Sequence, residues 1–146
     1  MTTPADAQSI PSKDLLLTAI RGWGHNSHPL LDAAQELVQL HQQSAICSAS
    51  QFDTLMARRI QLVHCIDTCV RTATPSPLPA ARIHTERLGS VVDRIAQLSA
   101  HLAVATVLPV FERIWIQLDD LADGYQHLID DLQAGIRRGP RSGEPG

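Results

Sequence analysis

The sequence predicts an all-α protein, an antiparallel up-and-down four-helix bundle with a short extra N-terminal helix. Apolar residues recur at helical spacing along most of the chain, and no stretch alternates as a β-strand does. Segments rich in Gly or Pro separate the periodic runs. Four helices of about twenty residues, each about 30 Å long, pack as antiparallel neighbours when short loops join them.

Capping residues predict where the first three helices begin. Ser12 is the expected cap of the short helix. Asn26 or Ser27 is expected to cap the second helix, because Pro29 then fits its first turn. Ser50 is expected to cap the third.

Prolines and glycines predict the remaining boundaries. Three prolines at alternate positions make 72–80 a linker, because they cannot lie inside a helix. The fourth helix is expected to start near Thr85 and to end or kink at Pro109. The fifth is expected to close before Gly135 or Gly139.

Length and terminal composition predict one domain without a membrane segment. A chain of 146 residues suits a single core, so we expect one helical-bundle domain at 12–138 between flexible tails at 1–11 and 139–146. The longest apolar run, Leu102 to Phe111, is about half of what a bilayer needs. The first dozen residues lack the features of a signal peptide. We therefore expect a cytoplasmic protein with no membrane partner.

Charge and motifs exclude several classes of function. A net charge of −3 and 3% aromatic residues argue against a nucleic-acid partner. The odd count of three cysteines is typical of reduced thiols. The repeated Glu-x-x-His pattern of di-iron bundles and the Gly-rich phosphate loop are both missing. We expect neither a metal site nor a cofactor.

Several ionisable side chains lie where the helical pattern expects apolar ones. His41 lies at the centre of the second helix's apolar stripe, and Arg59 at the centre of the third's. Asp67 borders the stripe of the third helix, His84 is in line with that of the fourth, and Tyr125 lies within that of the fifth. A buried ionisable group is costly unless it is paired or hydrogen-bonded. Each of these positions therefore needs a reason.

Hairpin turns near residues 50, 78 and 108 would place these side chains at matching heights. Two adjacent layers result, one with His41, Arg59 and Arg94, the other with Asp67, Glu86 and Tyr125. For Tyr125, a core position with its hydroxyl reaching solvent or Asp67 is the simpler interpretation.

The layers predict a small anionic-ligand or enzymatic site in the bundle interior. Arg59 or Arg94 would hold the anion in a fork of donors, and His41 would transfer protons near neutral pH. Glu86 and Asp93 are the other candidate catalytic residues. The remaining candidate ligand-binding residues are Asp67, His84 and Tyr125. Alternatively, Arg59 pairs with a carboxylate and His41 bonds a neighbour, so that a buried network fixes the helix register.

The fourth predicted helix has two further stripes. A basic stripe repeats every seven residues, and a face of small and acidic residues lies opposite it. The members are Arg87, Arg94 and His101 in the first, and Glu86, Gly89, Asp93, Ala96 and Ala100 in the second. Gly89 in mid-helix costs about 1 kcal/mol against Ala, which indicates close approach by another backbone or a ligand. Near its end, Ala103, Val104 and Val107 make this helix apolar nearly all round, as in a central helix covered on several sides.

The segment 85–95 (TERLGSVVDRI) resembles the most recognisable part of a bacterial helical family, domain-of-unknown-function family 4254. The shared pattern is Thr-Glu, then Gly-Ser, then Asp-Arg followed by an aliphatic residue. Segments 28–31, 40–41 and 121–125 are similar to the family's actinobacterial branch, so the resemblance covers about 28–138. It implies an all-helical fold and no particular activity. After His41 this chain has two glutamines where many relatives carry acids, which argues against a shared carboxylate or metal site there.

Two functions therefore stay open. The first is the internal site for a small anionic metabolite. The alternative is a non-catalytic protein-interaction or homodimerisation module, whose partner would cover the small-residue face of the fourth helix.

Overall fold

The computed structural model describes residues 10–22, 28–73 and 79–138, and within the last range it describes side chains from Leu88 to Gln133. Every regular element in these residues is an α-helix, which confirms the all-α class. The helices are α2 (Lys13–Ile20), α3 (Pro29–Ser44), α4 (Ala49–Ala73), α5 (Pro79–Val104) and α6 (Leu108–Arg138). In the described part of the chain, no helix combines the length and hydropathy needed to traverse a bilayer.

The first two helices begin at side-chain caps. Ser12 Oγ accepts the Leu15 N–H at the start of α2, as predicted. At the start of α3 the cap is His28, whose Nδ1 accepts the Leu30 N–H at 3.1 Å. The predicted caps in 26–27 are therefore wrong, and those residues lie outside the described ones.

α4 begins with a capping box whose cap, Ser48, lies two residues before the expected one. Ser48 Oγ accepts the Gln51 N–H at 3.4 Å, and Gln51 Oε1 accepts the Ser48 N–H at 3.2 Å. The predicted cap at Ser50 is wrong, because α4 begins at Ala49 and Ser50 lies within its first turn.

α5 and α6 differ from the predicted boundaries at two prolines. α5 begins at Pro79 and not near Thr85, because a proline fits the first position of a helix. α5 ends at Val104, and Pro109 lies in the first turn of α6. The predicted linker 72–80 is wrong at both ends, because 72–73 belong to α4 and 79–80 to α5; residues 74–78 lie outside the described ones.

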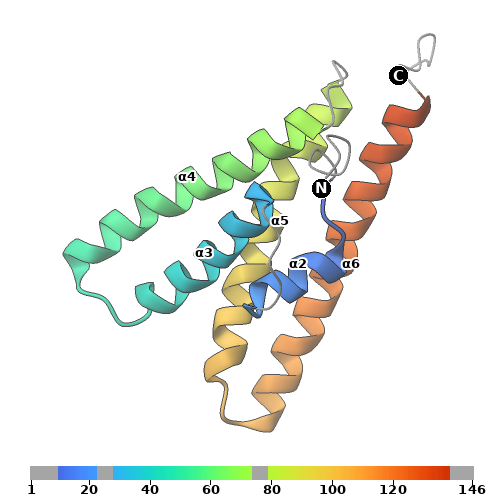
Figure 1. Ribbon diagram of the computed structural model, residues 1–146. Coiled ribbons are helices and arrows are strands. Elements are labelled where there is room, and N and C mark those ends of the chain that lie inside the picture. The colour runs from blue at the N-terminus through green and yellow to red at the C-terminus, as the bar shows by residue number, and fades with distance from the viewer. Residues whose placement is uncertain (1–9, 23–27, 74–78, 139–146) are drawn as a thin grey trace.

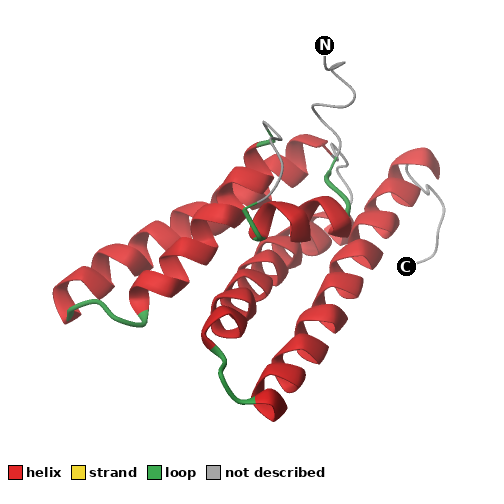
Figure 2. Ribbon diagram, turned by 60° about the horizontal axis from the view of Figure 1, so that its bottom comes forward, coloured by secondary structure: helices red, strands yellow, loops and turns green. Residues whose placement is uncertain are grey.

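α5 is the central helix of the arrangement. It packs on α3, α4 and α6, whereas the short α2 packs on α3 and α6 and lies across the space between them (Figure 1). The Gln35 amide on α3 donates to the Ala19 carbonyl on α2, and Lys13 on α2 pairs with Asp123 on α6 at 2.6 Å. The loop ends of the α3–α4 and α5–α6 hairpins diverge (Figures 1 and 2). The two hairpins thus share a core at one end and separate at the other.

Candidate functional site

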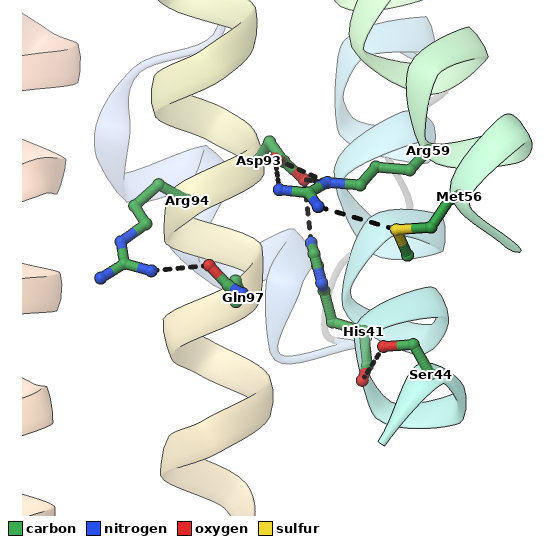
Figure 3. Close-up of polar contacts among 7 residues, drawn as sticks. All are labelled: His41, Ser44, Met56, Arg59, Asp93, Arg94 and Gln97. Carbon is green, nitrogen blue, oxygen red and sulfur yellow. Dashed lines mark hydrogen bonds and ion pairs between the residues drawn. The ribbon is translucent and has the colours of Figure 1, made fainter. Parts of the chain in front are cut away.

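An ion network joins α3, α4 and α5 at the carboxylate of Asp93. His41 Nε2 lies 2.8 Å from Asp93 Oδ1, and Arg59 directs its Nη2 and Nε at Oδ2, at 2.6 and 3.0 Å (Figure 3). The side chains of His41 and Asp93 are only 5% and 10% exposed, and that of Arg59 is 34% exposed. Three helices therefore meet at one buried carboxylate.

The donors keep this carboxylate ionised. Burial acts to raise the pKa of Asp93, but the hydrogen bonds from His41 and Arg59 outweigh it and hold the pKa below the usual range. An ionised carboxylate only accepts hydrogen bonds, so His41 Nε2 must carry the proton that it donates. Both oxygens of Asp93 are thereby occupied.

Gly89 explains how α4 comes close enough to α5 for Arg59 to reach Asp93. A Cβ at Gly89 would overlap Asp67 Oδ1 and would lie 3.0 Å from the Val63 carbonyl oxygen. The Gly89 N–H also donates to Asp67 Oδ1 at 3.1 Å. The predicted close approach at Gly89 is confirmed, as is the matching height of Asp67 and Gly89.

Two predicted site residues lie elsewhere. Arg94 is exposed, bonds Gln97 at 2.7 Å and points away from Asp93 (Figure 3). Arg94 lies at the predicted height, one residue from Asp93, but its expected inward direction is wrong, because successive helical residues point about 100° apart and Asp93 takes the inward position. The buried Tyr125 hydroxyl donates to the Pro11 carbonyl at 2.7 Å, so its predicted approach to Asp67 or solvent is also wrong. Burial raises the pKa of Tyr125.

The other predicted residues divide into two groups. His41, Arg59 and Asp93 come together, which is the arrangement of the buried-network alternative. The side chains of His84 and Glu86 lie outside the described residues.

The network has little capacity left for a ligand. Arg59 directs Nε and Nη2 at Asp93 and Nη1 at the Met56 sulfur, so an incoming anion would compete with these acceptors. Neither of the two hollows described below is lined by His41, Arg59 or Asp93. Among the described residues, no three His, Cys, Asp or Glu side chains are grouped as metal ligands.

A groove of about 550 Å³ lies between α2, α3, α5 and α6, just beyond the C-terminal end of α2. Its apolar lining is Leu17, Ile20, Val38, Leu102, Ala103, Ala105, Phe111, Trp115 and Leu118, and its polar lining is Arg21, Gln42 and Ser99. A second hollow of about 650 Å³, at the α3–α4 loop end, is lined by Gln43, Ile46, Cys47, Ser50, Gln51, Thr54 and Leu55, none of them charged. The groove is therefore the hollow that combines an apolar lining with a cation.

The end of α2 places Arg21 at this groove. Gly22 adopts a φ of +83° and its N–H bonds the Ala19 carbonyl, so Arg21 is the last residue before the chain turns away. The Arg21 guanidinium carbon lies 5.9 Å from the centre of the Trp115 ring. Arg21 is exposed, and no carboxylate among the described residues pairs with it.

Reasoning from the sequence missed this groove. Phe111, Trp115 and Leu118 are spaced along the same α6 stripe as Tyr125, which is a signal the sequence does contain. Arg21 followed by Gly22 is an ordinary helix end, and nothing in the sequence places α2 between α3 and α6.

Comparison with known proteins gives no match to a family model, to a curated protein or to a solved structure. The function is therefore inferred from the geometry of the chain itself.

Proposed function

We propose that the chain binds a small amphipathic anion, a carboxylate with an apolar body, in the groove between α2, α3, α5 and α6. The observation that carries this proposal is a cation at the rim of a mainly apolar groove, Arg21, for which no described carboxylate is a partner. The proposal keeps the anionic ligand predicted from the sequence and moves its anchor from Arg59 or Arg94 to Arg21.

The size and lining of the groove support a ligand of this class. Small-molecule sites commonly have volumes of about 300–1,000 Å³, mostly apolar walls and a few polar groups that fix orientation. Phe111 and Trp115 offer aromatic surface for an apolar chain or ring. Arg21 offers a planar fork of donors to a carboxylate, and Gln42 and Ser99 offer uncharged hydrogen-bonding groups.

The lining favours binding over catalysis. Among the described residues, no His, Asp, Glu, Cys or Lys lines the groove, so these residues supply no general acid, general base or activated nucleophile there. We place this binding in the cytoplasm, where the free thiols of Cys47, Cys65 and Cys69 would stay reduced.

We also propose that the four long helices act as one bundle, with the groove as the open part of its interior.

Calorimetric titration with decanoate tests the proposal, and decanol serves as the uncharged analogue. We expect wild type to bind decanoate more tightly than decanol, and Arg21→Gln to weaken decanoate binding about fivefold while leaving decanol unchanged, because an exposed Arg–carboxylate pair contributes about 1 kcal/mol. Arg94→Gln is the matched control, since Arg94 is exposed but lies away from the groove lining. Equal decanoate affinity in wild type and Arg21→Gln, or no decanoate binding to wild type, would overturn the proposal.

A further inference from the structure

The end of the α5–α6 hairpin is an apolar surface that the chain itself leaves uncovered. Val104 is 73% exposed, Leu108 66% and Ile116 60%, and Val107 and Val110 are also exposed. We call these five residues the apolar end. The predicted coverage of the last turn of α5 on several sides is therefore wrong for the described residues, because none of their helices packs over Val104.

The apolar end is the continuation of a helix face that is buried further along. Leu118, Tyr125 and Ile129 on α6 are at most 5% exposed, under α2 and α5. Before Leu118 the helix is apolar on most sides, with Glu112, Arg113 and Gln117 as the exceptions. A helix that is apolar all round is normally buried on all sides. None of the described helices of the same chain covers this first part of α6 on its outer side.

We infer that a second copy of this chain covers the apolar end, so that the protein is a two-fold symmetric dimer joined at its α5–α6 loop ends. In a two-fold interface the same surface of both subunits comes together, so that surface must not place like charges opposite each other. Between Arg94 and Glu112 the sequence contains no Asp, Glu, Lys or Arg. Val104, Val107, Leu108 and Val110 lie in this uncharged stretch, so two copies can meet through them without burying like charges, whereas Ile116 has Glu112 and Arg113 one turn away.

Charges elsewhere limit where two copies can meet. Asp119, Asp120 and Asp130 are exposed along the outer face of α6, and the chain carries a net charge of −3. Two copies aligned side by side along α6 would repel each other there, so contact at the loop end is favoured. The small-residue face of α5, predicted to receive a partner, is unavailable because Gly89, Ala96 and Ala100 are already buried in the chain.

The charges also argue against a membrane as the occupant of this surface. Anionic lipid surfaces bind clusters of Lys and Arg. The described residues flanking the apolar end offer His101 and Arg113, with Glu112 beside Arg113. A second copy is thus the partner that the charge pattern favours.

Sedimentation velocity over a range of micromolar concentrations tests this inference on the full chain. We expect wild type to shift from monomer to dimer as concentration rises. Leu108→Glu and, separately, Ile116→Glu should each weaken the dimer at least about tenfold, because each places like charges in the two-fold contact. Ile60→Glu is the matched control, since Ile60 is 71% exposed on α4 and lies outside the apolar end, so it should leave the dimer unchanged.

Two further measurements make the result decisive. Circular dichroism melting at a concentration where wild type is monomeric should give the same midpoint for wild type and both variants, since the altered side chains are exposed. A mixture of Leu108→Glu with Leu108→Lys should restore dimers, because opposite charges then face each other across the two-fold axis. A chain that stays monomeric, a dimer insensitive to both Leu108→Glu and Ile116→Glu, or a monomer that instead binds phosphatidylcholine–phosphatidylglycerol vesicles would overturn the inference. The decanoate titration of wild type and Arg21→Gln tests the proposed function separately, and its result does not depend on whether the chain dimerises.

Discussion

The middle and the end of α5 differ in a way that polarity alone does not predict. In the middle, Asp93 is charged and yet buried, because His41 and Arg59 satisfy both of its oxygens. At the end, Val104 is apolar and yet 73% exposed, because none of the described helices covers it. Whether a group needs a further partner therefore depends on whether its hydrogen bonds and its burial are already satisfied, and not on its polarity. We therefore expect binding at the apolar end, which no described helix covers, and at Arg21, which no described carboxylate pairs with.

The energetic roles of the two regions differ accordingly. The network ties three helices together and should contribute to the stability of each single chain. The apolar end contributes little to the stability of a single chain, and its side chains gain burial only in a dimer. Substitutions in the middle should therefore change unfolding, and substitutions at the end should change association.

Asp93→Ala should have the largest effect on stability. It removes the carboxylate and leaves the buried His41 and the partly buried Arg59 without an acceptor, so we expect a loss of about 3 kcal/mol in the free energy of unfolding. Urea denaturation followed by circular dichroism measures it. Asp123→Ala is the control, because Asp123 forms a solvent-screened pair with Lys13, and it should cost far less than Asp93→Ala. Equal losses from the two substitutions would contradict a special role for the buried network.

Gly89→Ala should have the next largest effect. An added Cβ would overlap Asp67 Oδ1 and press on the Val63 carbonyl, so α4 must shift away from α5. We expect a loss of about 1–3 kcal/mol, although Ala is the better helix former by about 1 kcal/mol.

Gly124→Ala on α6 is the matched control for that substitution. Nothing lies within 4 Å of the position that a Cβ would take there, so only helix propensity changes. This variant should be more stable than wild type by about 0.5–1 kcal/mol in the same urea experiment. If Gly89→Ala were stabilising as well, the close approach of α4 to α5 would not be a constraint on the fold.

The helices and the layer of His41 and Arg59 could be predicted from the sequence because both depend on local periodicity. Helical spacing places an inward side chain on its helix, and short hairpin loops place neighbouring helices at a common height. The same reasoning placed Asp67 beside Gly89. The reasoning failed for the direction of the Arg94 side chain, because a matching height does not fix which of two successive residues points inward. Asp93, which is adjacent, is the inward residue.

The groove could not be predicted because it depends on the placement of a short helix. α2 lies between α3 and α6 through long-range bonds, such as the Tyr125 hydroxyl to the Pro11 carbonyl. Those partners are far apart in sequence and leave no periodic signal. The cap at His28 was missed for a different reason: Ser, Thr, Asp and Asn are the usual capping residues, and an imidazole nitrogen is an uncommon acceptor at that position.

The smallest predicted effect is the pH dependence of the network. The pKa of Asp93 is lower in the folded chain than its ordinary value, so its contribution to stability is complete above the ordinary value, near 4. That contribution is lost as the pH falls through the lower folded value, where the carboxyl takes up a proton. The stability gap between wild type and Asp93→Asn should therefore be largest near neutral pH and should narrow below about pH 4.

Urea denaturation at a series of pH values down to about 3 measures this gap. Other carboxyls with a lowered pKa, such as Glu36 beside Arg58, also lose stability in acid, but they do so in both proteins and cancel in the difference. Leu108→Glu, which leaves the network intact, should follow the wild-type pH dependence at concentrations where both proteins are monomeric. A gap of constant size across the series would mean that Asp93 acts in the fold through its shape and not through its charge.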